Sequence, residues 1–436
     1  MQVNLGRFFT RPVWLKIHLY LALIAGFFFV LIGLSGSLSV YRDELDTLLN
    51  PKLHIENPQG KFQSLDKIIA AVKAAHPERH GSWTLEMPRT AHDMMTAWYE
   101  KPQETFFEFY APLMVSVNPY TAEVVSNRFW GQTTMTWLLD LHTQLRLDRF
   151  GWQMVGIVGG LLMLSVASGL YLWWPAKSRF KQVFQIRLHG GVLQLAFDLH
   201  RWCGLVFAPA LLTLAFTGLQ LSYPGILESL LSTPDMGHGN NGKNVTSTAR
   251  PNNHPVPLEA AEFIARGPFP QATLRRVTTP VGETGTYRIN LRQSDEINTK
   301  HPFTMVWIDR WSGHIKEVRN PNQFPWGEKL MSSLWPVHTG EALGSAGRFL
   351  WFLTGLAPLF LYVTGLLHWL HKSGKIQDQP IDYVAMQRRL LRWQALCQRI
   401  AAKMFKTVLL LIKLAQPYLK SAWKKAVYYL HRLRKR

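Results

Sequence analysis

Four long segments of the chain contain no Asp, Glu, Lys or Arg. They cover residues 17–40, 150–176, 202–227 and 349–371. A helix needs about 20 apolar residues to cross the hydrocarbon core of a bilayer, and each segment is long enough. Tryptophans gather near the ends of these segments, where the headgroup region favours amphipathic rings. The pattern predicts a membrane bundle of four helices.

Basic residues are divided unequally among the segments that flank the spans. Residues 1–16, 177–201 and 372–436 carry 24 Lys and Arg against three acids, whereas 41–149 and 228–348 carry 24 against 25. Cytoplasmic segments of membrane proteins hold the excess of Lys and Arg. We therefore expect both termini and the 177–201 loop in the cytoplasm and both long loops outside. The net charge of +20 follows this asymmetry, so we expect no nucleic-acid binding.

The two ends of the chain each admit an alternative. The first apolar run is longer than a typical signal-peptide core, and no convincing cleavage site follows it, so we expect an uncleaved anchor. From Tyr383 onward there are 14 Lys and Arg and no acid, interleaved with apolar runs. This pattern predicts a basic amphipathic tail on anionic lipid. A fifth span over 404–419 is the alternative, although that run is short and holds Lys406 and Lys413.

The two halves of the sequence match each other. Two constant shifts, of 182 and 196 residues, align histidines and glycines at His18/His200 and Gly36/Gly218, and at His142/His338 and Gly169/Gly365. The first span then matches the third, and the second matches the fourth. We therefore expect each half to contain a span, an outer domain and a return span.

Both long loops show the same predicted order of elements. A capped amphipathic helix over 64–72 or 257–264 comes first, and strand–turn–strand patterns follow at 115–124 and 306–315. The stretch 232–256 is rich in Asn, Gly, Thr and Pro, which is typical of a flexible loop. The expected fold class is a four-helix membrane bundle with duplicated halves and two extracytoplasmic α+β domains.

Four of the 16 histidines recur between the halves. The predicted topology places His18 and His200 at the cytoplasmic ends of two spans, and His142 and His338 just before two spans on the outer side. A pseudo-two-fold axis along the membrane normal would let the members of each pair face one another. Two opposed neutral imidazoles can supply both axial ligands of a b-type haem, so the pattern predicts two haems. Glycines in the spans would let helices pack closely or admit a porphyrin edge.

The sequence offers fewer ligands for other kinds of metal site. A zinc site wants three or four ligands, usually with Cys, and two histidines per level fall short. His368 and His371 lie one helical turn apart at the inner end of the fourth span and are alternative inner ligands, although the duplication does not match them. The two cysteines, Cys203 and Cys397, are far apart and there is no C-x-x-C-H motif, which excludes a disulfide scaffold and c-type haem.

Several motifs together resemble the PepSY-associated transmembrane family, also called iron-regulated inner-membrane proteins. They are His18-Leu-Tyr, Ser35-Gly36, Tyr41-Arg-Asp-Glu-Leu45, Leu141-His142-Thr143, Ser168-Gly-Leu-Tyr-Leu-Trp-Trp-Pro175, Phe197-Asp-Leu-His200-Arg-Trp and Val337-His338-Thr339-Gly340. The resemblance covers roughly residues 10–375. It implies a multi-pass protein of the bacterial inner membrane with periplasmic PepSY domains, and one group of the family reduces ferric siderophores with two bound haems. The basic tail and Leu367-His368-Trp369-Leu370 depart from the family pattern.

The resemblance and the four histidines predict a haem-dependent transmembrane ferric siderophore reductase. Electrons would enter at the inner pair, cross to the outer pair and reduce a periplasmic ferric complex, with Arg146, Arg149, Trp335 and Arg348 as docking groups. The cytoplasmic segments hold no G-x-G-x-x-G signature, so the donor would be a membrane quinol or a separate cytoplasmic reductase. The alternatives are a non-enzymatic module whose outer domains bind peptide or protein, and a transporter of iron-related ligands.

Overall fold

The computed structural model describes residues 10–174, 184–188, 190–234, 244–249, 254–380, 388, 391 and 392. The predicted tail beyond residue 380 lies almost wholly outside these residues, as does much of the predicted 232–256 loop. The chain divides into a large unit, residues 1–186 and 196–375, and a small one, residues 187–195 and 376–436. Within the small unit, the Val192 N–H donates to the Gln379 carbonyl (2.9 Å).

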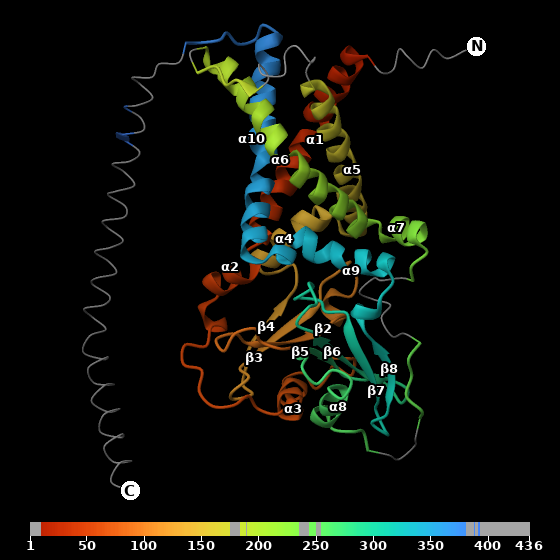
Figure 1. Ribbon diagram of the computed structural model, residues 1–436. Coiled ribbons are helices and arrows are strands. Elements are labelled where there is room, and N and C mark those ends of the chain that lie inside the picture. The colour runs from red at the N-terminus through yellow and green to blue at the C-terminus, as the bar shows by residue number, and fades with distance from the viewer. Residues whose placement is uncertain are drawn as a thin grey trace, which may run out of the picture. The chain divides into compact units, whose positions relative to one another are not determined.

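Four helices among the described residues are long and apolar enough to cross a membrane (Figure 1). They are α1 (Arg11–Ser39), α5 (Asp148–Trp173), α6 (Val192–Ser222) and α10 (Gly344–Lys372). The four predicted spans are therefore present as helices. The protein is a membrane protein, and α1 packs against both α5 and α10.

The helix that contains most of the third predicted span, 202–227, both begins and ends earlier in the chain than that span. α6 begins at Val192, inside the predicted 177–201 loop, and it includes Asp198 and Arg201, which pair with each other (3.5 Å). This start was not predicted, because the predicted span was limited to residues without a charge. The helix ends at Ser222 because Pro224 lacks an N–H to continue it and restricts the residue before it.

Short helices join the bundle to the rest of the large unit. They are α2 (Arg42–Leu49), α4 (Thr134–Gln144), α7 (Pro224–Leu231) and α9 (Trp326–Thr339). α4 begins at a capping box in which the hydroxyls of Thr133 and Thr136 satisfy backbone groups of the first turn. The sequence did not predict α4 and α9, which carry His142 and His338.

The strands of both long loops form one antiparallel sheet of eight strands in the described part of the chain. Its order is β4 (Val124–Phe129), β3 (Leu113–Val117), β2 (Met95–Tyr99), β1 (Thr84–Glu86), β5 (Thr273–Thr278), β6 (Thr286–Arg292), β7 (Thr304–Asp309) and β8 (Ile315–Arg319). The sequence predicted a separate sheet for each loop. Instead, β1 pairs with β5, with Leu85 opposite Val277, so the two four-stranded meanders share one ladder.

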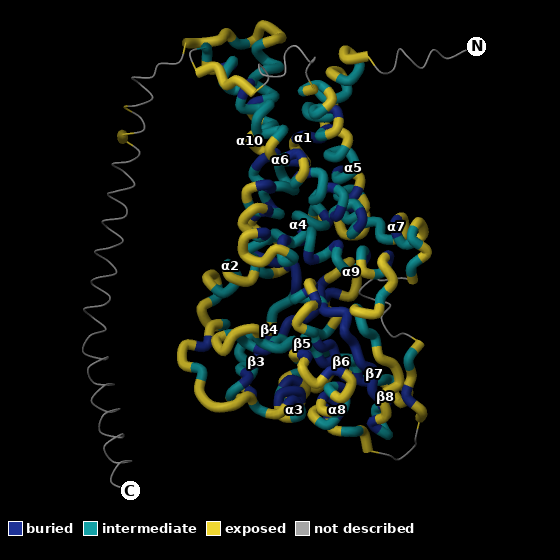
Figure 2. The backbone as a smooth tube through the Cα atoms, viewed as in Figure 1, coloured by how far each residue is buried: buried dark blue, intermediate teal, exposed yellow. Residues whose placement is uncertain are grey.

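Two helices cover one face of this sheet, α3 (Leu65–Ala75) and α8 (Leu258–Ala265), as the sequence predicted. Their apolar side chains form the main core together with inward residues of the strands, and Figure 2 shows this buried layer. The two helices also cap each other. The Asp66 carboxylate accepts from the Leu258 N–H (2.8 Å), and the Glu259 carboxylate accepts from the Leu65 N–H (3.0 Å). The two halves are thus tied by exchanged caps as well as by strands.

Candidate functional site

The structure brings the four predicted histidines together in two pairs. His18 of α1 lies beside His200 of α6, with 6.4 Å between ring centres and 86° between ring planes. His142 of α4 lies beside His338 of α9, at 6.1 Å and 37°. All four residues are half-buried. We call His18 and His200 the far pair, because their helices α1 and α6 carry them at the end of the bundle away from the sheet, and we call His142 and His338 the sheet-side pair.

The spacing of each pair suits one metal between two imidazoles. A metal–nitrogen bond of about 2 Å on each side, with about 1.1 Å from that nitrogen to the ring centre, places the ring centres about 6.2 Å apart. Both observed distances lie close to this value. Among the described residues, no group of three or more His, Cys, Asp or Glu is placed to hold a metal ion. The ring-centre distances are compatible with the two axial ligands of one metal, which is the arrangement that the sequence predicted.

In the first half, the Nδ1 atom of each ring is held by a span. His18 Nδ1 lies 3.0 Å from both the Ser165 carbonyl and the Ser168 hydroxyl. His142 Nδ1 lies 2.9 Å from the Ile32 carbonyl. A carbonyl accepts only from a protonated Nδ1, so these contacts favour the tautomer in which Nε2 carries a lone pair for a metal.

In the second half, a threonine has the same role. Thr364 Oγ1 lies 3.0 Å from His200 Nδ1, and Thr217 Oγ1 lies 2.8 Å from His338 Nδ1. Each threonine hydroxyl donates to a carbonyl of its own helix. It therefore accepts from the imidazole, which again leaves Nε2 available.

A glycine faces each of the four rings. The contacts pair His18 with Gly169, His142 with Gly36, His200 with Gly365 and His338 with Gly218. A Cβ atom on these glycines would stand 3.1, 2.7, 3.3 and 3.2 Å from Cε1 of the respective ring. A Cβ atom at Gly36 would force the His142 ring to move, whereas at the other three glycines the ring would have to give by a few tenths of an ångström.

These glycines were predicted to serve helix packing or a porphyrin edge, and the structure gives them a different neighbour. Each follows directly after a serine or threonine, at Ser35, Ser168, Thr217 and Thr364. The signal that could have revealed their role is this dipeptide, which occurs in each span at a position that the two shifts align.

His368, the alternative ligand of the far level, lies outside both pairs. Its ring stacks on Phe197, with 4.3 Å between centres and 23° between planes. His371 lies in the last turn of α10. The ring beside His200 is that of His18, as the sequence predicted, and the ring of His368 packs on Phe197.

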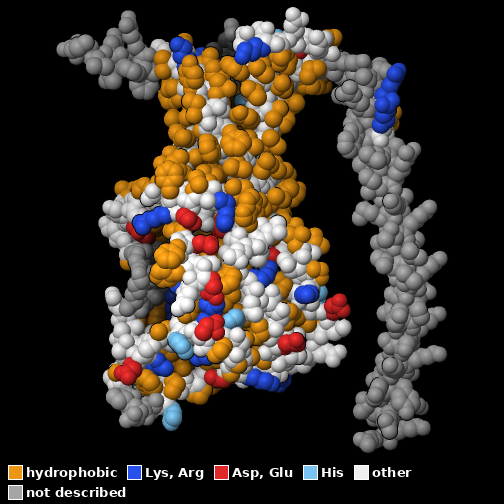
Figure 3. Space-filling model, turned by 180° about the vertical axis from the view of Figure 1, so that it is seen from behind, with side chains coloured by type: hydrophobic (Ala, Val, Ile, Leu, Met, Phe, Trp, Pro, Cys, Tyr) orange, Lys and Arg blue, Asp and Glu red, His pale blue; other side chains and the backbone are white. Residues whose placement is uncertain are grey.

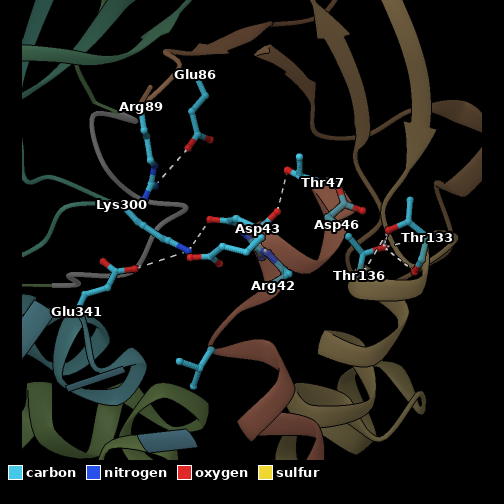
Figure 4. Close-up of polar contacts among 12 residues, drawn as sticks. Arg42, Asp43, Asp46, Thr47, Glu86, Arg89, Thr133, Thr136, Lys300 and Glu341 are labelled. Atoms are coloured by element: carbon cyan, nitrogen blue, oxygen red, sulfur yellow. Dashed lines mark hydrogen bonds and ion pairs between the residues drawn. The ribbon is translucent and has the colours of Figure 1, made fainter. Parts of the chain in front are cut away.

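A network of charged side chains lies between the sheet and the bundle (Figure 4). Lys300 reaches Asp43 of α2 (2.8 Å) and Glu341 (3.7 Å). Burial acts to raise the pKa of Asp43, but the charges of Arg42 and Lys300 outweigh it and hold that pKa well below its usual range. Nearby, Glu86 of β1 pairs with Arg89 (3.8 Å) and with Arg276 (3.0 Å).

Aromatic rings connect this network to the sheet-side pair. Arg42 lies over the Trp130 ring (5.4 Å), and Trp130 Nε1 donates to Asp140 of α4 (2.8 Å). From the other half, His301 packs edge-on against Trp335 of α9, three residues before His338. Trp130 thus lies between Arg42 of the network and helix α4, which carries His142, and Trp335 lies on α9, which carries His338.

A strained turn fixes α4 relative to α5. Leu145, Arg146 and Asp148 all have positive φ, of 50°, 58° and 51°, which side-chain-bearing residues rarely adopt. Asp140 holds the turn, because its carboxylate accepts from Arg146 (2.6 Å). The turn directly follows the helix that carries His142.

Three of the four predicted docking groups already have partners within the chain. Arg146 is bound to Asp140, Trp335 contacts His301, and Arg348 donates to the Val40 carbonyl and to Glu44. The fourth, Arg149, is exposed. The charged network joins residues far apart in the sequence: the motif Tyr41-Arg-Asp-Glu-Leu45 marked Asp43, but no local motif marked its partner Lys300.

Comparison with known families gives one match. The family model described as the PepSY-associated TM region matches residues 15–372. The matched range includes all four spans and both histidine pairs. No curated protein matches the chain.

Proposed function

Because this chain belongs to the PepSY-associated transmembrane family, we propose that it is an electron-transfer protein of the bacterial inner membrane that reduces a periplasmic ferric siderophore. The observation that carries the proposal is the pair geometry. Both histidine pairs lie at axial-ligand spacing, and every Nδ1 has a hydrogen-bond partner. Packing of the helices does not by itself require such an arrangement. Each half of the chain contributes one member to each pair, which supports an internal duplication with two PepSY-like domains.

A b-type haem bound at each pair would supply one-electron chemistry in the apolar interior of the bundle. His18 and His200 would hold the group at the far level, and His142 and His338 the group at the sheet side. The anchored Nδ1 atoms fix the ring orientation, and the glycines keep each ring in place.

The acceptor would dock on the sheet side, at the network around Lys300 and Asp43. This region lies beside the helices of the sheet-side pair and offers both signs of charge. Reduction would release iron because chelators with hard oxygen donors bind Fe(II) less tightly than Fe(III). The electron donor would meet the far pair from the cytoplasmic side, either as a membrane quinol or as a separate reductase.

The first test is spectroscopic. Protein purified from haem-replete cells should be red and show a Soret band that shifts on reduction with dithionite. His142→Ala and His338→Ala should each lose the sheet-side haem alone, and His18→Ala and His200→Ala the far haem alone. A colourless preparation would favour the non-enzymatic binding module.

The second test is vectorial. In proteoliposomes with a reductant sealed inside and the sheet region outward, an external ferric siderophore should be reduced faster with the protein than without it. The gain should vanish in His338→Ala and persist in the matched control His314→Ala, whose residue is exposed on the sheet. Equal rates with and without protein would leave the haems, if bound, without this role.

A further inference from the structure

The ends of α5 and α6 are tied together on the sheet side of the bundle. Trp152 Nε1 of α5 donates to the Ser222 carbonyl of α6 (3.2 Å), and the Tyr223 hydroxyl donates back to the Gln153 carbonyl (3.0 Å). We call this the α5–α6 corner. Since both helices are membrane spans, the corner lies where the bundle leaves the hydrocarbon core.

An aromatic loop, residues 106–110, lies against one side of this corner. Four of its five residues are aromatic, and Phe109 packs on Trp152 with 5.8 Å between ring centres. Its neighbours point outward instead: Phe106 is 59% exposed and Phe107 is 97% exposed. Fully exposed phenylalanine is costly in water, so this loop requires an apolar environment.

Helix α7 leaves the corner on its other side and also has an unpartnered apolar face. Leu227 is buried in a cluster with Met331 and Leu334 of α9, which fixes the orientation of α7. Ile226 and Leu230 are four residues apart and share a different face. They are 57% and 77% exposed.

Both surfaces adjoin the ends of spans: Phe109 packs on Trp152 of α5, and α7 begins two residues after the end of α6. Phe150, in the first turn of α5, is likewise exposed. Figure 3 shows apolar side chains covering the bundle on one face, with charged side chains first gathering where the bundle meets the sheet region. Neither residues 103–110 nor α7 contain Lys or Arg, so attraction to anionic headgroups cannot be what places them.

We propose that the aromatic loop and α7 both insert into the lipid interface of the sheet-side leaflet, one on each side of the α5–α6 corner. The inserted side chains are Phe106, Phe107, Ile226 and Leu230. They enter by burial of apolar area, in the manner of interfacial segments, and they hold the sheet region at a fixed height above the bilayer. The occupant is lipid and not a protein partner, because the surface begins at residues that contact the spans.

The test uses spin labels in the full-length protein in nanodiscs. In a background of Cys203→Ala and Cys397→Ala, a single cysteine is introduced as Phe107→Cys, Leu230→Cys or, as the control, Phe62→Cys. Phe62 is 46% exposed and contacts Tyr120, away from the spans. Because Phe107 and Leu230 make little contact with the protein, labels at these positions do not disturb the fold.

Labels at 107 and 230 should collide severalfold more with oxygen, and severalfold less with a water-soluble nickel chelate, than the label at 62. The result should be the same in phosphatidylcholine alone and with added phosphatidylglycerol, since no basic residue is involved. Nickel accessibility at 107 and 230 equal to that at 62 would overturn the proposal. The measurement requires neither haem nor a siderophore, so its outcome is independent of the proposed reductase function.

Discussion

Replacing Gly36 by alanine tests the histidine geometry most directly. The new Cβ atom would stand 2.7 Å from His142 Cε1 and 3.0 Å from Nδ1. Carbon atoms normally approach to about 3.5 Å, so the ring has to move by roughly 0.8 Å. Metal–ligand distances tolerate changes of about 0.2 Å, and the Nδ1 bond to Ile32 limits how the ring can turn. We expect Gly36→Ala to lose the sheet-side haem.

The same substitution at Gly218 is the matched comparison. There a Cβ atom would stand 3.2 Å from His338 Cε1, which asks for a shift of only about 0.3 Å. Gly218→Ala should keep both haems with a perturbed sheet-side spectrum. Gly160→Ala is the neutral control, because nothing lies within 4 Å of its new methyl group.

The assay is haem per protein from the pyridine haemochromogen, together with a redox titration of the purified variants. Gly36→Ala should hold half the haem of the unaltered protein and lose one redox transition, whereas Gly160→Ala should match it. Full haem content in Gly36→Ala combined with haem loss in Gly218→Ala would reverse the expected order and refute the contact argument.

Three further predictions concern the surroundings of the pairs. Thr217→Val removes a hydrogen bond from His338 Nδ1 worth about 0.5–1.5 kcal/mol, so the sheet-side midpoint potential should rise by roughly 20–65 mV with haem content unchanged, as a redox titration would show. Asp140→Ala leaves Trp130 Nε1 without its acceptor and releases Arg146, so thermal unfolding should report a loss of about 2 kcal/mol and weaker sheet-side haem binding. Because the folded pKa of Asp43 is depressed, its stabilising effect is present above its unfolded pKa of about 3.9 and is lost as pH falls towards the folded value. Asp43→Asn should therefore flatten the acid side of the stability–pH curve, and an unchanged slope would contradict this reading.

The sequence predicted the spans and the histidine pairs for physical reasons. Charge-free runs of span length are rare outside membranes, and two constant shifts mark equivalent positions in the halves. Topology then sets which histidines share a level. His18 and His200, and likewise His142 and His338, were matched in this way and lie together in the structure.

The parts that the sequence did not predict depend on contacts between distant residues. β1 is only three residues long, too short to show an alternating pattern, and its partner β5 lies in the other half. The start of α6 was hidden by Asp198, whose charge is paired within the helix. Lys300 and Asp43 meet across the halves, and no spacing rule joins them.

The ladder between β1 and β5 has a mechanical consequence. With the exchanged caps of α3 and α8, it joins the sheet regions of the two halves by backbone hydrogen bonds. A carrier that works by alternating access must let its halves rock against each other, which here would mean breaking strand pairs and caps in every cycle. Tunnelling between fixed sites makes the opposite demand, because its rate falls steeply when the sites drift apart. The joined sheet regions therefore fit the proposed electron transfer between fixed sites better than they fit transport by alternating access.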